Sequence, residues 1–160
     1  MEPRRGQGAQ WPKMAASKEM VGDYEVSDSM SDMLGKGSFG LVVKGFHKDT
    51  GQVVAVKKIK LKAGHYWKEL QEKYLDIEAK ALEMTKDHPN IVHMYHQEKM
   101  DKHHYFVLEY CDMGTVEEYM HETEVTEKQV ALFIRDIVSS VDFLHSLNMI
   151  HRDLKPENFL

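Results

Sequence analysis

The sequence has 160 residues, which is long enough for one ordinary domain with its own hydrophobic core. Its 21 Lys and Arg against 26 Asp and Glu leave a formal net charge of -5, so we expect neither nucleic acid nor an anionic membrane as a partner. The single cysteine, Cys111, excludes an intramolecular disulfide, and no apolar run is typical of a signal peptide or a membrane span. We therefore expect a cytoplasmic protein, with the nucleus left open. Composition does not specify the oligomeric state.

The first 23 residues are rich in Gly, Gln, Lys and small residues, and they have no hydrophobic periodicity. Such a segment cannot bury enough apolar surface to offset the entropy lost when it is ordered. We predict a disordered leader over residues 1–23 and the start of the folded domain at Tyr24.

A glycine-rich segment with the spacing G-x-G-x-x-G follows, at Gly35, Gly37 and Gly40. Glycines permit a tight turn and let backbone N–H groups approach phosphate oxygens, which a Cβ would obstruct. Taken alone, the pattern also fits a hairpin that binds no ligand. A dinucleotide-binding fold is disfavoured, because the strand-like Val42 and Val43 follow where that fold requires a helix.

Two Val-rich runs at residues 41–46 and 53–59 enclose a polar segment, which predicts a β-hairpin. The second run contains Val54-Ala55-Val56-Lys57. Most strand lysines lie on a solvent-facing surface, and Lys57 is open to that interpretation. Its place one hairpin after the glycine loop also suits an ammonium group that neutralises bound phosphate.

A helical stretch follows, with apolar residues at alternating spacings of three and four that predict one stripe packed against the sheet: Trp67, Leu70, Tyr74, Ile77, Ala81 and Met84. A buried lysine needs a counter-charge. Glu78 adjoins this stripe, so we expect it to be the partner of Lys57.

A second strand pair is predicted at residues 91–96 and 105–109, with a charged turn at residues 99–103. Capping boxes predict a short helix beginning at Thr115 and a long helix over residues 127–146. Asn148 is a suitable left-handed stop after the long helix. The predicted inner face of this helix consists of Val130, Phe133, Ile134, Ile137, Val138, Val141 and Leu144.

The segment His151-Arg152-Asp153-Leu154-Lys155-Pro156-Glu157-Asn158 carries the most specific pattern of the chain. A His-Arg-Asp triplet alone can be a loop-stabilising ion pair. With Lys155 and Asn158 at fixed offsets, the segment has what phosphoryl transfer to an alcohol requires. The Asp153 carboxylate can accept the hydroxyl proton, the ammonium can balance phosphate charge, and the amide oxygen can ligate Mg²⁺.

The glycine loop, the Val-Ala-Val-Lys strand and the His-Arg-Asp loop occur in the order of the protein-kinase signature, so residues 24–160 resemble a eukaryotic-type protein kinase. The Lys155-Pro156-Glu157-Asn158 form resembles the serine/threonine branch. The resemblance implies an α+β fold, in which a small antiparallel β lobe with one long helix precedes a mainly helical lobe. Residues 24–112 would form the first lobe and the hinge, and residues 113–160 the beginning of the second lobe.

The resemblance also implies ATP and Mg²⁺ as cofactors and a protein with a Ser or Thr acceptor as substrate. In this interpretation Lys57 holds the phosphates and pairs with Glu78, Asp153 is the catalytic base, Lys155 lies near the transferred phosphate, and Asn158 binds Mg²⁺. The implied ATP contacts are Leu34, Gly35, Lys36, Gly37, Ser38, Phe39, Gly40, Val42, Ala55, Lys57, Leu108, Glu109, Cys111 and Leu160.

The signature set also includes an Asp-Phe-Gly segment, which these 160 residues do not contain. Two hypotheses follow. In the first, the chain is part of an active serine/threonine kinase, cut off just after its catalytic loop. In the second, it is a truncated, catalytically inactive kinase fragment or isoform that binds nucleotide or a partner. We expect the 160-residue chain alone to be inactive.

Overall fold

The computed structural model describes residues 19–37, 40–100 and 102–160. Residues 1–18 of the predicted leader, and Ser38 and Phe39 of the glycine loop, lie outside the described residues. The described elements are, in chain order, β1 (Glu19–Val21), β2 (Tyr24–Val26), η1 (Met30–Asp32), β3 (Met33–Gly37), β4 (Gly40–His47), β5 (Val53–Lys60), α1 (His65–Thr85), β6 (Met94–Met100), β7 (His103–Glu109), α2 (Val116–Glu122), α3 (Glu127–Ser146) and η2 (Pro156–Asn158).

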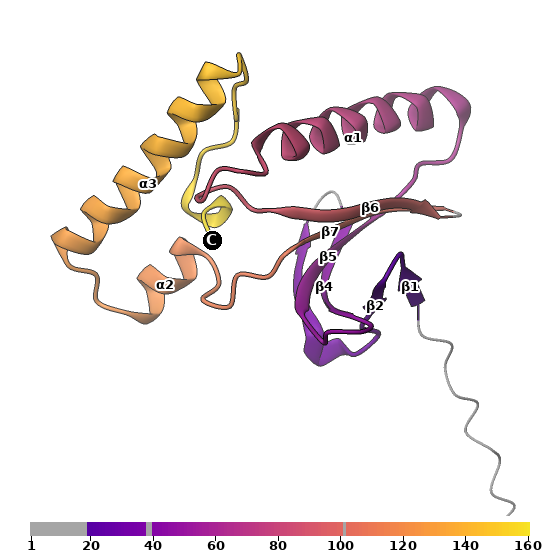
Figure 1. Ribbon diagram of the computed structural model, residues 1–160, viewed down its shortest axis with the longest axis horizontal. Coiled ribbons are helices and arrows are strands. Elements are labelled where there is room, and N and C mark those ends of the chain that lie inside the picture. Colours follow the sequence, from indigo (N-terminus) through magenta and orange to yellow (C-terminus); the bar gives the residue numbers. More distant parts are fainter. Residues whose placement is uncertain (1–18, 38–39, 101) are drawn as a thin grey trace, which may run out of the picture.

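The described strands form one antiparallel sheet in the order β1-β2-β4-β5-β7-β6, with β3 paired to β4. Helix α1 crosses one side of this sheet, while α2 and α3 lie beyond its end (Figure 1). This arrangement confirms the predicted α+β fold, in which a β lobe with one long helix precedes a helical region. The first predicted hairpin is confirmed, with β4 one residue longer at each end and β5 one residue longer at its C-terminal end. In the second predicted pair, β6 begins at Met94 instead of residue 91 and continues to Met100, and β7 begins at His103 instead of residue 105. Both strands therefore extend into the turn predicted at residues 99–103.

Two hydrophobic clusters cover opposite faces of the sheet. Successive side chains of a strand alternate between its two faces. Val54 and Val56 therefore point to one side of β5, and Lys57 and Ile59 point to the other. One cluster lies under the β1–β2 hairpin and consists of Val21, Val26, Val43, Val54, Val56, Tyr105 and Val107. The other lies under α1 and consists of Ile59, Leu61, Leu75, Ala79, Met94 and Phe106.

The predicted leader extends too far toward the domain, because β1 begins at Glu19. The side chain of Glu19 accepts hydrogen bonds from Lys58 of β5, at 2.8 Å, and from the hydroxyl of Tyr105 of β7. Val21 is completely buried, and the N–H of Gly22 donates to Glu98 of β6 at 2.8 Å. These are contacts with residues far along the chain, which local composition could not indicate.

The predicted inner stripe of α1 is wrong. The helix turns Leu75 and Ala79 into the core, with Leu82 partly buried against it. Trp67, Tyr74, Ile77 and Met84 are instead exposed. Leu75 and Ala79 pack with Ile59 and Phe106 of the sheet, and the apolar spacing along the helix could not indicate which face meets those residues.

Helix α3 spans the predicted residues, and both capping boxes are present, from Thr115 to Glu118 and from Thr126 to Gln129. Asn148 has a φ of 57°, which confirms the left-handed stop. The predicted inner face is only partly covered. Phe133, Ile137, Val141 and Leu144 are half-buried, and Val130, Ile134 and Val138 are exposed.

None of the helices in residues 19–37, 40–100 and 102–160 has the combination of length and apolar character that crossing a bilayer requires.

Candidate active site

Lys57 and Glu78 form the central ion pair of the sheet region. The ammonium Nζ of Lys57 lies 2.6 Å from Oε1 of Glu78, and the two side chains are 24% and 39% exposed. Lys57 comes from the middle strand β5, and Glu78 from the face of α1 that packs on the sheet. The ring of Phe106 lies beneath the ammonium, 5.9 Å from its centroid. The predicted partnership of Lys57 and Glu78 therefore exists in the structure.

The strand register brings several predicted nucleotide contacts into two neighbouring rows. Residues that face each other in adjacent strands point to the same side of a sheet. Gly35, Val42 and Lys57 form one row, with Phe106 as its last member. Ala55 and Leu108 are directly paired in the next row. The half-buried side chains of Val42, Ala55 and Leu108 thus form a small apolar wall beside the Lys57 ammonium.

The glycines on either side of the undescribed loop tip meet different constraints. A Cβ at Gly40 would lie 2.2 Å from the carbonyl oxygen of Lys58, so β4 approaches β5 too closely there for any side chain. A Cβ at Gly35 would meet nothing within 4 Å. The strand β3 therefore has open space above Gly35, as backbone that covers a phosphate needs. Leu34 is 39% exposed, and Lys36 is also exposed.

The segment after β7 contains the residues predicted to meet the adenine edge. The N–H of Glu109 donates to the carbonyl of His93 at 2.8 Å. Any backbone hydrogen bond between Glu109 and adenine would therefore use the Glu109 carbonyl oxygen. Cys111 has a half-buried free thiol. Burial, helped by the negative charges of Glu109 and Asp112, raises the pKa of the Cys111 thiol, which keeps it protonated at neutral pH.

The second group of predicted residues gathers around Asp153. Nδ2 of Asn158 donates to Oδ2 of Asp153 at 2.8 Å and to its backbone carbonyl at 2.7 Å. The ammonium of Lys155 lies 3.4 Å from the same carboxylate oxygen, and the N–H of Asp153 donates to Nδ1 of His151 at 3.3 Å. Arg152 has a φ of 70°, an uncommon conformation for a residue with a side chain. The three residues predicted for catalysis and metal binding in this loop are therefore in contact.

These contacts also set the charge of Asp153. The hydrogen bond from Asn158 lowers the pKa of the Asp153 carboxyl below its ordinary value, and it outweighs the opposing effect of desolvation. The positive charge of Lys155 lowers this pKa further. Asp153 is consequently a carboxylate at neutral pH, the form that can accept a proton.

The two groups belong to regions that meet at the connection between α1 and β6. Ser140 of α3 donates to the carbonyl of Asn90 at 3.0 Å, and the rings of His88 and Phe143 stack with centroids 4.8 Å apart. The N–H of Val116 at the start of α2 donates to the carbonyl of Phe159 at 2.8 Å, which connects the segment after η2 to that helix.

Among the described residues, no hydrogen bond or ion pair joins Lys57 or Glu78 directly to Asp153 or Asn158. Leu160, predicted to contact adenine, is 60% exposed.

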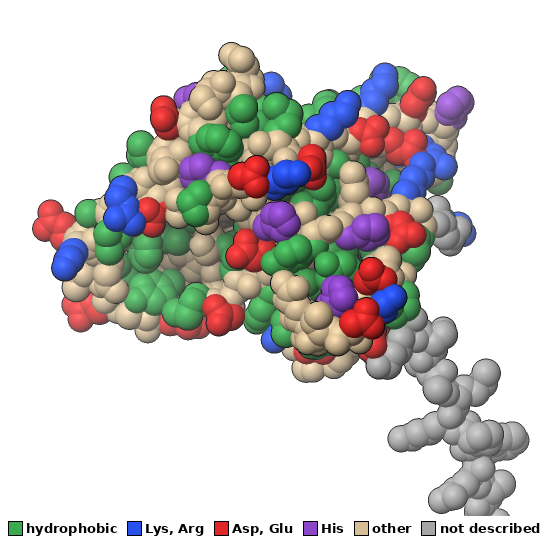
Figure 2. Space-filling view, in the orientation of Figure 1, with side chains coloured by type: hydrophobic (Ala, Val, Ile, Leu, Met, Phe, Trp, Pro, Cys, Tyr) green, Lys and Arg blue, Asp and Glu red, His purple; other side chains and the backbone are tan. Residues whose placement is uncertain are grey.

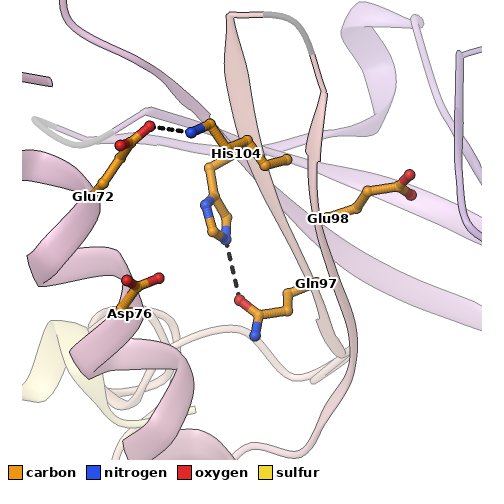
Figure 3. A pocket seen from close by; sticks show the side chains of 6 residues that line it. Glu72, Asp76, Gln97, Glu98 and His104 are labelled. Atoms are coloured by element: carbon orange, nitrogen blue, oxygen red, sulfur yellow. Dashed lines mark hydrogen bonds and ion pairs between the residues drawn. The ribbon is translucent and has the colours of Figure 1, made fainter. Parts of the chain in front are cut away.

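A cavity of about 340 Å³ lies between α1 and the β6–β7 hairpin, and none of its lining residues is a predicted nucleotide contact (Figure 3). Its buried member, His104, hydrogen-bonds Gln97 at 3.2 Å and stacks on Phe106. Burial lowers the pKa of His104, so its ring is uncharged at neutral pH. Across the cavity Glu72 is ion-paired with Lys99. Within the described residues no cluster of His, Cys, Asp and Glu could hold a metal ion. We therefore interpret this cavity as part of the contact between α1 and the sheet.

The sequence analysis assigned no individual role to two residues that support the site. Phe106 is completely buried and positions Lys57 from below, and His151 accepts the backbone N–H of Asp153. The position of Phe106 within the second strand run, opposite Lys57, could have indicated its role only after the strand register was known.

The fold and both groups of residues are those of a protein kinase, and comparison with known proteins agrees. The model of the protein kinase domain matches residues 29–160, so the chain belongs to the protein kinase family. The predicted resemblance is thereby confirmed. Members of this family generally use ATP and Mg²⁺ and act on protein substrates.

Several serine/threonine and calcium-dependent kinases are similar to the chain. It is 36% identical to the serine/threonine-protein kinase ULK1 of Homo sapiens, over 100% of the chain and 14% of that protein. It is 36% identical to calcium-dependent protein kinase 5 of Plasmodium falciparum (isolate 3D7), over 84% of the chain and 24% of that protein. Against serine/threonine-protein kinase pakF of Dictyostelium discoideum the identity is 33%, over 82% of the chain and 11% of that protein. The chain thus spans less than a quarter of the length of each of these relatives.

Proposed function

We propose that the chain is the ATP-binding part of a serine/threonine protein kinase, which transfers the γ-phosphoryl group of ATP to a Ser or Thr hydroxyl of a protein. The observation that carries the proposal is the 2.6 Å pair between Lys57 and Glu78 of α1, because Lys57 lies in the same cross-strand row as Val42 and Gly35. In this row a fixed cation lies beside a glycine strand with open space above it. A triphosphate needs this combination of charge and close backbone approach.

In the proposed site, Lys57 holds the phosphates, and Glu78 and Phe106 keep its ammonium in position. Val42, Ala55, Leu108 and Leu160 provide apolar contacts for adenine, and the backbone of Glu109 and Cys111 provides its polar contacts. Gly35, Gly37 and Gly40 cover the phosphates together with Leu34, Lys36, Ser38 and Phe39. These roles come from the family resemblance, and the strand register supports those of Gly35, Val42, Ala55 and Leu108.

Asp153 is proposed as the base that accepts the proton of the substrate hydroxyl. Its lowered pKa keeps it ionised, and the contact from Asn158 orients the carboxylate. Because Nδ2 of Asn158 is already donated to Asp153, the amide Oδ1 is the atom that can ligate Mg²⁺, a cation that prefers oxygen ligands. Bound Mg²⁺ would neutralise phosphate charge, and the ammonium of Lys155 would add to this effect near the transferred group.

The serine/threonine preference rests on Lys155-Pro156-Glu157-Asn158 and on the relatives named as serine/threonine kinases. For the 160-residue chain taken alone, we propose nucleotide binding without turnover, as in the second hypothesis. The specific observation is that these residues contain no Asp-Phe-Gly segment, whose aspartate supplies a Mg²⁺ ligand in kinases.

The proposed function is tested by two substitutions in the full-length gene product, assayed with radiolabelled ATP and a Ser/Thr peptide library. We expect Asp153→Asn to lower turnover about 10²- to 10⁴-fold, with unchanged affinity for a fluorescent ATP analogue. Lys57→Met should weaken both turnover and analogue binding. Retention of most of the activity by Asp153→Asn, or label found on tyrosine alone, would contradict the proposal.

A further inference from the structure

Lys44 of β4 lies on the side of the sheet that carries the proposed adenine contacts. It is directly opposite Ala55 of β5, and Ala55 in turn faces Leu108 of β7. Residues that face each other in adjacent strands point to the same side of a sheet. Lys44 therefore extends the row of Ala55 and Leu108. Its side chain is half-buried, although a strand lysine ordinarily extends into solvent.

The ammonium of Lys44 contacts an aromatic ring and no carboxylate. It lies 5.1 Å from the centroid of the Tyr110 ring, a distance at which the cation is attracted to the face of the ring. No ion pair within the described residues involves Lys44. Tyr110 is half-buried as well, and it follows β7 in the segment that leads to α2 (Figure 1). The pair thus joins β4 to the connection between the sheet region and the helical region.

This connection is held on its other side by Glu109. The N–H of His93 donates to Oε2 of Glu109 at 3.2 Å, and the N–H of Glu109 donates to the carbonyl of His93 at 2.8 Å. In the described turns and loops, no backbone hydrogen bond involves Tyr110 or Cys111. The contact of the Tyr110 ring with Lys44 therefore holds the connection toward β4, beside the backbone of Cys111.

The strand register argues against a role of Lys44 at the phosphates. Lys44 lies two residues beyond Val42, which is in the row of Lys57. Two residues along a strand span about 7 Å, so Lys44 is displaced by about that distance from the phosphate row toward the adenine row. Lys57 and its partner Glu78 already supply a fixed cation at the phosphates. Nor does Lys44 belong to the basic side chains along the outer edge of α1 in Figure 2, because it is a residue of β4.

We propose that Lys44 is a positioning residue for the adenine of ATP. Its ammonium holds the ring of Tyr110 against β4, and this contact fixes the depth at which the carbonyl of Glu109 and the backbone of Cys111 meet the adenine edge. In this role Lys44 contacts neither the nucleotide nor the transferred group. The inference rests on the proposed ATP site, and it predicts an effect on nucleotide affinity and none on the chemical step.

The test measures initial rates of the full-length gene product with Mg·ATP and a Ser/Thr peptide, and the inhibition constant of adenosine, which has the base but no phosphate. Lys44→Met keeps the apolar stem and removes the charge. We expect it to raise KM for ATP and the inhibition constant of adenosine by the same factor of about two to five, the size of an exposed cation–π contact, with kcat unchanged. Lys44→Arg should restore both constants, because a guanidinium also stacks on an aromatic face.

A double-mutant cycle tests the pair itself. Tyr110→Leu should reproduce the effect of Lys44→Met, and the double variant K44M/Y110L should bind adenosine no more weakly than either single variant. Tyr110→Phe keeps the ring and should bind adenosine as the parent protein does. The matched control is Lys62→Met, which removes another cation–π contact, 5.4 Å from the Trp67 ring and outside the site. It should leave both constants unchanged.

Four results would overturn the inference and leave the proposed function intact. These are no effect of Lys44→Met, additive effects of Lys44→Met and Tyr110→Leu, an equal effect of Lys62→Met, or a raised KM for ATP with an unchanged inhibition constant of adenosine. The last result would assign Lys44 to the phosphates. A parent protein that neither transfers the phosphoryl group nor is inhibited by adenosine would instead refute the proposed function. Circular dichroism verifies that each variant is folded, and the comparison of Tyr110→Leu with Tyr110→Phe replaces Lys44→Met if that variant is unfolded.

Discussion

The sheet region and the helical region that follows it differ in how they hold their functional residues. All the buried hydrophobic side chains among the described residues lie between Val21 and Val107, in β1 to β7 and α1 and the segments joining them. Helices α2 and α3 and the short η2 contain no buried residue. Lys57 and Glu78 are accordingly fixed by elements packed on a core, whereas Asp153 is fixed by contacts with residues at most five positions away.

The two proposed catalytic groups are therefore held in position in two different ways. The position of Lys57 depends on the packing of Phe106, Ile59 and Leu75, so distant substitutions in the core should disturb it. The arrangement of Asp153, Lys155 and Asn158 depends on a short local sequence, so it should survive changes elsewhere. The following predictions test this contrast.

The largest effect is expected in the core. Phe106→Ala removes a completely buried ring from under α1 and should lower the free energy of unfolding by about 3–5 kcal/mol. Phe133→Ala in α3 removes a half-buried ring and should cost less than about 2 kcal/mol. Urea denaturation followed by circular dichroism measures both. Similar losses of stability for the two variants would show that the two regions are packed alike.

The ion pair of the sheet region comes next. Glu78→Gln removes the charge that holds Lys57 and should lower kcat/KM for ATP about 10- to 100-fold, because a misplaced phosphate ligand costs catalysis more than binding. The matched control is Glu72→Gln. Glu72 lies on the same helix as Glu78, and its substitution breaks the ion pair with Lys99 of β6 and leaves the Lys57 pair intact. Steady-state kinetics of the full-length gene product distinguishes them. If both variants lost activity equally, α1 as a whole, and not the pair, would be responsible.

A smaller effect is expected at the start of α3. Thr126→Ala removes the cap that accepts from the N–H of Gln129 and should destabilise the helix by about 1 kcal/mol. Amide hydrogen exchange should become about fivefold faster in α3 and stay unchanged in β5, because the two regions are held separately. Lys128→Ala, on the exposed side of the same turn, serves as control. Equal acceleration in β5 would mean that the regions open as one unit.

The smallest effect concerns Glu19 and pH. Burial alone would raise the pKa of Glu19, but hydrogen bonds from Lys58 and Tyr105 outweigh it and lower the pKa below its ordinary value. Since the folded pKa is the lower one, the stabilisation is complete above the unfolded pKa and is lost as the pH falls through the folded pKa. Glu19→Gln should therefore cost up to about 1 kcal/mol at neutral pH, a figure reduced for the exposure of the pair.

The difference between Glu19→Gln and the parent protein should shrink as the pH is lowered toward about 3, below the ordinary glutamate range. Unfolding by urea at both pH values measures it, and the exposed Glu124→Gln is the control. A difference that persists unchanged at low pH would exclude the charge of Glu19 as its cause.

Local patterns predicted those elements whose determinants are local. Thr126, Gln129 and Asn148 gave the start and the stop of α3, because a cap or a left-handed residue acts on the nearest turn. The first hairpin followed from its two Val-rich runs and the polar segment between them. The start of β6 was misplaced, because Ile91 and Val92 also favour a strand and propensity alone does not distinguish strand from connection.

The sequence by itself determined the family of this protein: a glycine strand, a lysine on an apolar strand and a His-Arg-Asp loop identify a protein kinase through residue type and order. Only the tertiary structure decided which residues of α1 face the sheet, that Glu19 belongs to a strand, and that Phe106 lies beneath Lys57. The physical reason is that these outcomes depend on close packing between elements far apart in the chain. The neighbours of a residue along the sequence do not specify that packing.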